Sequence, residues 1–213
     1  MRAFCLLLAG CVVFPRALEP PANDETTVAL LTGALGHPMD GIARHPWFAV
    51  RHKGELEWRV FEVGGSGRES DPFHRHEPYL DPILHKVWRG DEGERAAACV
   101  ERVGPPIKED IERHYFLVPG PNSNTFGDRV LRACKLSASL PATAIGKDWR
   151  GAIGAGVTSE RTGIQIETAV LGFKIGLKEG VEVHVLGLSI GVDLWPPAIL
   201  IPLGPGRLGF ADR

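Results

Sequence analysis

The last third of the chain shows the clearest alternation of apolar and polar residues. Residues 164–167, 173–175 and 181–185 alternate with a period of two, and Lys178-Glu179-Gly180 supplies a turn between the last two runs. This alternation is typical of strands that bury one face, and frequent glycines mark bends between them. From residue 151 onward the pattern predicts an antiparallel meander with one apolar face. We expect that face to form half of an ordinary core; lining a lipid cavity is the alternative.

A second alternating stretch, residues 45–63, predicts a β-hairpin. Phe48 and Val50 alternate before a Lys53-Gly54 turn, and Leu56, Trp58, Val60 and then Glu62 share one face after it. Residues 26–36 are mildly apolar, and their pattern fits either a strand or a short helix.

Between these regions lie predicted helices and one short strand. Apolar spacing predicts helices over residues 93–103 and 107–114, separated by Gly104-Pro105-Pro106. Residues 115–118 are uncharged and rich in aromatic and β-branched side chains, which indicates a strand. Pro119-Gly120-Pro121 forces a turn, and apolar residues recur at helical spacing from Phe126 onward.

The corner before this helix holds Asn122, Ser123, Asn124 and Thr125, all of which are residue types that cap helices. A side chain held there faces the positive end of the helix dipole, which suits a nucleophile, and Ser123 is the candidate. The alternative is that these residues only cap the helix. His45, at the start of the hairpin, is the candidate general base, and Glu57 on the second strand is its candidate orienting partner.

Composition and charge narrow the class of protein. With 213 residues, 44% hydrophobic and 23% charged, the chain is globular, with one or two domains and room for a core. A net charge of −2 gives no electrostatic case for a nucleic-acid partner.

The N-terminus has the features of an export leader. Met1-Arg2 precedes an uncharged apolar stretch, residues 3–14, which is too short to span a bilayer. Leu8-Ala9-Gly10-Cys11 resembles a bacterial lipobox, so Cys11 is a candidate lipid anchor; an ordinary cleaved signal and an uncleaved N-terminus are the alternatives. We expect export to the periplasm, or anchoring as a lipoprotein in the cell envelope. Residues 1–18 are then a leader, 19–39 a linker, 40–150 an α+β unit and 151–213 the meander packed on it.

Two cysteines, Cys99 and Cys134, remain beyond the leader. They form either one disulfide in an oxidising compartment or two buried thiols. No CxxC pair is present, so neither a zinc site nor a thioredoxin-type site is indicated. His74 and His76 in a proline-rich loop are a weak alternative metal pair, and we expect neither a metal nor another cofactor.

Two family resemblances rest on short motifs. Residues 45–54 and Asn122-Ser123-Asn124-Thr125-Phe126 resemble, in order and spacing, the motifs of circularly permuted papain-like (NlpC/P60-type) hydrolases and acyltransferases, with serine in place of their cysteine. More of the chain resembles the bacterial family known as domain of unknown function 3750, notably residues 45–48, 119–126 and 140–149. That resemblance implies an envelope protein of unestablished activity.

Together these features predict an α+β fold: a permuted papain-like unit with a Gly-rich C-terminal antiparallel sheet. The leading functional hypothesis is a serine-dependent hydrolase or acyltransferase acting on an amide or ester, such as a cell-wall peptide or a lipid ester. Membrane attachment would come from the leader or from Cys11. The N–H groups around Ser123 and Asn124 are the expected oxyanion donors. We expect the substrate cleft to be lined by Trp47, Asn122, Asn124, Thr125, Lys147 and Asp148. The alternative is a non-catalytic envelope binding or scaffold protein.

Overall fold

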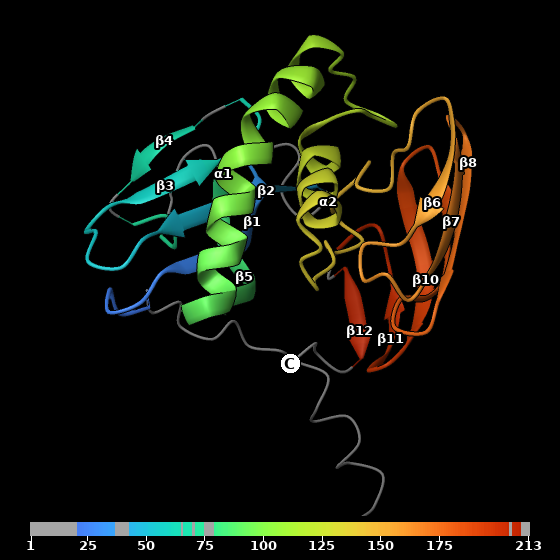
Figure 1. The fold of residues 1–213 in the computed structure, drawn as a ribbon. Helices are drawn as coiled ribbons and strands as arrows, with labels where there is room; N and C mark the ends of the chain where they lie inside the picture. The colour runs from blue at the N-terminus through green and yellow to red at the C-terminus, as the bar shows by residue number, and fades with distance from the viewer. Residues whose placement is uncertain are drawn as a thin grey trace, which may run out of the picture.

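The computed structural model describes residues 21–36, 43–64, 66–69, 71–74, 79–204 and 206–209. The fold is α+β, as predicted, and is built from two antiparallel sheets with two helices between them (Figure 1). The predicted leader, with Cys11, lies outside the described residues. None of the helices in the described part of the chain is both long and apolar enough to cross a membrane.

The first sheet has the strand order β4-β3-β2-β1-β5. Its strands are β1 (Thr27–Leu35), β2 (Arg44–Arg51), β3 (Trp58–Phe61), β4 (Ser66–Glu69) and β5 (Tyr79–Arg89). The predicted hairpin is confirmed as the antiparallel pair β2–β3, with Phe48 opposite Phe61. Both faces of the sheet bury apolar residues, one of them against the helices.

The central strand β1 corrects the predicted domain division. Residues 27–35 fall within the predicted linker, yet they pair with β2 on one side and β5 on the other. Nearly every residue of β1 is buried. Because both faces are covered, the strand has no polar alternation, and its sequence therefore did not distinguish a strand from a helix.

Helix α1 (Gly90–Arg113) runs without interruption through the predicted break. Pro105 and Pro106 lie inside it, and Gly104 approaches the Phe61 ring so closely that a Cβ there would be 3.3 Å from it. The buried face of α1 packs on the sheet, with Ala96, Val100 and Ile111 in the core. Tertiary packing thus outweighs the local preference of Gly-Pro-Pro to end a helix.

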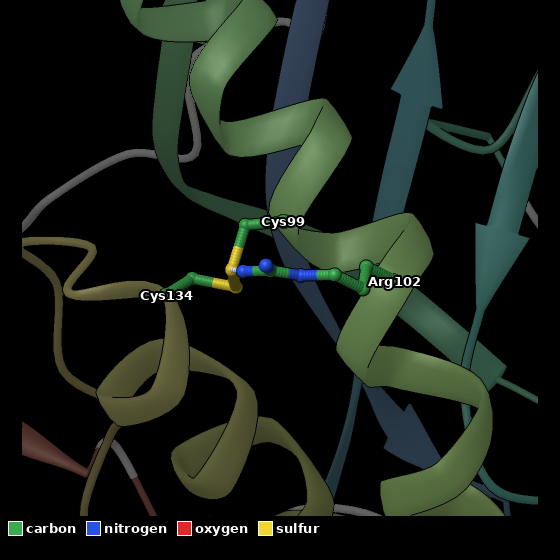
Figure 2. The surroundings of a disulfide bond; sticks show 3 residues. All are labelled: Cys99, Arg102 and Cys134. Carbon is green, nitrogen blue, oxygen red and sulfur yellow. Dashed lines mark hydrogen bonds between the residues drawn. A yellow bond between two sulfur atoms is a disulfide. The ribbon is translucent and has the colours of Figure 1, made fainter.

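A disulfide between Cys99 and Cys134 joins α1 to the end of α2 (Ser123–Cys134), which decides between the two alternatives for these cysteines. Figure 2 shows Arg102 of α1 reaching toward the bond, with its Nη2 atom 4.0 Å from Cys99 Sγ. The bond fixes the two helices that cover the first sheet relative to each other.

The predicted C-terminal meander is confirmed as a seven-stranded antiparallel sheet with the order β12-β11-β10-β9-β8-β7-β6. Its strands are β6 (Ile153–Val157), β7 (Gly163–Thr168), β8 (Leu171–Gly176), β9 (Gly180–Val185), β10 (Leu188–Leu194), β11 (Pro197–Leu200) and β12 (Arg207–Gly209).

The two faces of this sheet are the reverse of what we predicted. The face toward the rest of the protein buries polar side chains, namely Gln165, Glu167, Lys174, Glu182, His184, Ser189 and Asp193. The outer face is apolar and exposed. One row of directly paired residues crosses all seven strands: Val157, Ile164, Ile175, Val181, Val192, Ile199 and Leu208. Among the described residues, the apolar face is therefore exposed and does not form half of a core.

Candidate functional site

The N-terminus of α2 is closed by a complete capping box. The Asn122 side chain accepts hydrogen bonds from the N–H groups of Asn124 and Thr125, and the Thr125 hydroxyl accepts one from the Asn122 N–H. Asn122 also donates to the carbonyls of Leu117 and Ile145 at 2.7 and 3.0 Å. Asn122 and Thr125 are both predicted to bind substrate, but their side chains make their hydrogen bonds within the protein. The Asn124 N–H is also taken by the cap, which removes it as an oxyanion donor.

Ser123 is the first residue of α2, and its side chain is partly exposed. Ser123 and Tyr115 line the same cleft. Burial raises the pKa of Tyr115, and an interaction with the Ser123 side chain opposes that shift. The predicted strand at residues 115–118 was wrong, because this segment is an exposed loop that leads to the corner.

His45 lies near the start of β2, with its Nε2 atom 2.9 Å from Glu62 Oε2. Both side chains are buried. Glu57, the predicted partner, lies on the exposed part of the hairpin, so Glu62 takes its place in the site. A carboxylate accepts the Nε2 proton and leaves Nδ1 as the proton acceptor of the ring.

The orientation of the His45 ring is also set by stacking. The ring of Tyr79, at the start of β5, lies parallel to it at an interplanar angle of 8°, with the centroids 4.1 Å apart. Gly33 is paired with His45 across the sheet, and a Cβ at Gly33 would lie 2.7 Å from Tyr79 Cβ. Because Gly33 has no Cβ, Tyr79 can pack directly against β1 beside the His45 imidazole.

His45 and Ser123 line the same cleft, which has a volume of about 390 Å³. Tyr79, Tyr115 and Asn124 line it as well, and Leu117 and Val118 form its apolar lip. The predicted base and nucleophile, which are far apart in sequence, thus both contribute to the lining of one cleft.

Asn124 lines the cleft and has one buried side-chain oxygen without a partner among the described residues. Its Nδ2 donates to the Ile145 carbonyl at 2.9 Å, whereas its buried Oδ1 has no hydrogen-bond partner within the described residues. The side chain is 5% exposed. A buried acceptor without a partner is costly, so this oxygen is suited to receive an N–H or O–H from a bound molecule.

A positive charge also lies at the wall of the cleft. Arg44 donates to the Thr32 hydroxyl at 2.8 Å and to the Thr32 carbonyl at 2.9 Å. Burial lowers the pKa of Arg44, although Asp81 opposes the shift. Arg44 belongs to the lining of the cleft, and its charge is partly offset by Asp81.

Three residues predicted to line the substrate cleft lie elsewhere. Trp47 is fully buried in the core on the face of the first sheet that the helices do not cover. Lys147 and Asp148 are buried against the polar face of the second sheet. Lys147 Nζ lies 3.0 Å from Glu182, and Lys174 Nζ lies 2.7 Å from Asp148 and 3.1 Å from Glu182.

The charged side chains of this buried network shift one another's pKa values. Burial by itself raises the pKa values of Asp148 and Glu182, but the ammonium groups of Lys147 and Lys174 outweigh it and hold both values below the usual carboxyl range. Burial lowers the pKa of His184, whereas Asp148, Glu167 and Glu182 outweigh it, so that pKa is raised. These ion pairs hold the second sheet against Lys147 and Asp148, which precede the sheet in the chain.

Asp148, Glu182 and His184 offer ligand atoms within 4.8 Å of one another, which is a spacing suited to a metal ion. The two lysine ammonium groups already contact both carboxylates, so the positive charge that a metal would supply is present. In the weak alternative pair, His74 contacts Asp71 at 2.7 Å, and His76 lies outside the described residues.

Sequence reasoning missed Glu62, Tyr79 and Tyr115. Glu62 had a usable signal, since it continues the buried alternation of Trp58 and Val60 and so places a carboxylate at an inward position. Tyr115 falls in the predicted strand, and Tyr79 falls inside the proline-rich loop that contains His74, where no element is predicted.

No curated protein and no solved structure matches the chain. A family model described as "protein of unknown function (DUF3750)" matches residues 25–149, which is more than half of the chain and covers both His45 and Ser123. The chain therefore belongs to the DUF3750 family.

Proposed function

We propose that this protein is a serine-dependent hydrolase or acyltransferase acting on an amide or ester. Ser123 is the nucleophile, His45 is the general base and Glu62 orients His45. The observation that carries the proposal is the shared cleft, in which His45 is held through Nε2 by a buried carboxylate while Ser123 stands at a helix N-terminus.

The reaction follows from these positions. Ser123 Oγ passes its proton to His45 Nδ1 and forms a bond to the carbonyl carbon of the substrate. The tetrahedral intermediate collapses, the bond to the leaving alcohol or amine breaks, and His45 returns the proton to that group. Water, or an acceptor alcohol or amine, then attacks acyl-Ser123 by the same route and restores the hydroxyl.

The developing oxyanion has two donors nearby. One is the N–H of Ser123 itself at the positive end of α2, and the other is the hydroxyl of Tyr115, which lines the same cleft. Once Ser123 Oγ turns to His45, the Tyr115 proton is available to the oxyanion. Asn124 Oδ1 then accepts a hydrogen bond from the substrate.

A permuted papain-like arrangement fits the same geometry, with the base at the start of a strand and the nucleophile opening a helix later in the chain. The substrates that suit it are a cell-wall peptide or a lipid ester in the bacterial envelope. The Cys99–Cys134 disulfide supports placement outside the cytoplasm, where such bonds persist.

Labelling with a fluorophosphonate probe tests the proposal. The native chain is expected to be labelled at Ser123, and both Ser123→Ala and His45→Ala are expected to abolish labelling. Glu57→Gln is the matched control, because this carboxylate lies on the same hairpin at an exposed position. Labelling that persists in Ser123→Ala, or is absent from the native chain, overturns the mechanism.

The second candidate is a non-catalytic binding protein. The completeness of the Asn122–Thr125 capping box favours it, because most of the polar corner is explained by helix capping alone. This candidate predicts that Ser123→Ala leaves ligand binding and every other property of the protein unchanged.

A further inference from the structure

The outer face of the β6–β12 sheet is broad enough to need a cover. Seven strands at about 4.8 Å spacing give a width of roughly 29 Å, and strands of about six residues give a height of roughly 17 Å. The projected area is about 500 Å², which is at the upper end of the apolar patches that monomeric proteins leave exposed. The face carries no charged side chain among its outward positions.

This apolar surface continues around one end of the sheet. The β7–β8 and β9–β10 turns meet there through a hydrogen bond from the Leu186 N–H to the Val170 carbonyl. Val170 is 61% exposed and Leu186 is 47% exposed, in turns where polar residues are usual. Ile153, at the same end of β6, is 83% exposed.

The same end of the sheet adjoins the Ser123 cleft. Gly187 accepts a hydrogen bond from the Gly146 N–H and packs against Pro119. Pro119 follows the lip of the cleft, where Leu117 and Val118 are 57% and 41% exposed. Figure 1 shows the segment between α1 and α2 reaching toward this end of the sheet. The apolar end of the sheet thus lies beside the segment that forms the lip of the cleft.

Leu186 occupies its turn at a conformational cost. Its φ is +51°, and Gly187 after it has a φ of +79°, in a two-residue hairpin turn. The first position of such a turn favours Asn, Asp or Gly, because a larger side chain is strained in the left-handed region. A half-exposed leucine there serves neither the turn nor the core, which points to a contact outside the chain.

The opposite end of the sheet has charged turns. Glu160 and Arg161 lie between β6 and β7, and Lys178 and Glu179 lie between β8 and β9. Leu177 and Trp195 are also exposed at that end. An indole beside charged turns is the arrangement found where an apolar phase meets water. The turns at one end of the strands are therefore apolar, and those at the other end are charged.

We propose that the outer face and the apolar end of the β6–β12 sheet dock on a lipid bilayer and present the Ser123 cleft to its surface. Protein–protein interfaces have a polar rim, whereas at the end that adjoins the cleft this face continues into apolar turns. A second copy packed face to face would cover the flat face and leave the turns in water. The apolar interior of a lipid bilayer can cover both the flat face and the turns.

Vesicle flotation of the full chain tests the docking, with vesicles of phosphatidylcholine alone. Val170→Asn and Leu186→Asn should each weaken partition roughly tenfold. Leu56→Asn is the matched control, since Leu56 is 80% exposed on the first sheet's hairpin, and it should bind as the native chain does. All variants keep the same N-terminus, so a contribution from the apolar leader cancels. Because the docking surface is uncharged, the difference should persist at high salt.

Equal partition of Val170→Asn, Leu186→Asn and the native chain overturns the proposal. So does a stable dimer in lipid-free sedimentation that Phe173→Asp converts to monomer while vesicles stay unbound. Docking does not depend on the chemistry of Ser123, and Ser123→Ala should float with the vesicles as the native chain does. Loss of probe labelling with intact flotation therefore contradicts only the proposed function.

Discussion

Glu62 Oε2 lies 2.9 Å from His45 Nε2, and the two side chains are buried together beside the cleft that Ser123 lines. In the proposed mechanism, this contact decides which ring nitrogen holds the proton and stabilises the imidazolium formed when Ser123 is deprotonated. Glu62 would then act through His45, as a positioning residue.

Glu62→Gln should lower the rate of probe labelling at Ser123 by roughly a hundredfold, because an amide neither enforces the tautomer nor offsets the charge of the imidazolium. Labelling rates of the native chain, Glu62→Gln and Glu57→Gln, measured across the pH range from 5 to 9, provide the check. Glu57→Gln should leave the rate unchanged. An equal loss in both variants would contradict the assignment of Glu62.

Tyr115→Phe should reduce turnover by about ten- to a hundredfold while leaving KM nearly unchanged, since its hydroxyl is proposed to bond the oxyanion only in the transition state. Steady-state kinetics on an ester substrate identified through the labelled enzyme supply the measurement. A rise in KM with an unchanged kcat would instead place Tyr115 in ground-state binding.

Local patterns predicted the elements with one exposed face or a distinct cap. The β2–β3 hairpin, the start of α2 near Asn122 and the C-terminal meander all carried such signals. The pattern failed where tertiary contacts decide: β1 is buried on both faces, and α1 continues through Pro105 and Pro106 because its face packs on the sheet.

The site residues divide in the same way, into those marked by local patterns and those set by tertiary contacts. Ser123 and His45 stand at element ends that the sequence marks, whereas the pairing of His45 with Glu62 depends on strand register. Alternation in the second sheet predicted that one face is apolar, but a period of two does not say which face meets the rest of the protein. That choice is made by Lys147 and Asp148, whose partners Lys174 and Glu182 lie on distant strands.

Reduction of the Cys99–Cys134 disulfide should lower the free energy of unfolding by about 3–4 kcal/mol, because the bond closes a loop between residues 35 positions apart. For a chain of this size the melting temperature should fall by roughly 10 °C. Calorimetry of the oxidised chain and of the Cys99→Ser/Cys134→Ser variant measures the change. Arg102→Gln, which alters only the neighbouring side chain, should melt within about 2 °C of the native protein.

Stability should also depend on the protonation of His184. Its pKa is raised in the folded protein by Asp148, Glu167 and Glu182, so the protonated ring contributes stability in full below its unfolded value near 6.5. That contribution is lost as the pH rises through the folded pKa. Asp148 and Glu182 have lowered pKa values, so their contribution is present above the usual carboxyl range and is lost in acid.

Urea unfolding from pH 5 to pH 9 should therefore show a decline on the alkaline side that His184→Gln removes. His52→Gln serves as the control, since this histidine pairs with Glu101 at a partly exposed site on the first sheet. An identical alkaline decline in His184→Gln would assign the loss to other groups.

The last prediction concerns the backbone at Leu186. Asn is tolerated in the left-handed region far better than Leu, so Leu186→Asn should raise the free energy of unfolding by about 1 kcal/mol and the melting temperature by roughly 2–4 °C. Leu177→Asn is the matched control: it removes another exposed leucine in a turn of the same sheet where the backbone is not left-handed, and it should leave the melting temperature unchanged. A lower melting temperature for Leu186→Asn would show that the side chain packs within the protein. A gain in stability together with weaker vesicle partition would mean that leucine is retained at this turn for its external contact, because selection for folding alone favours Asn or Gly there.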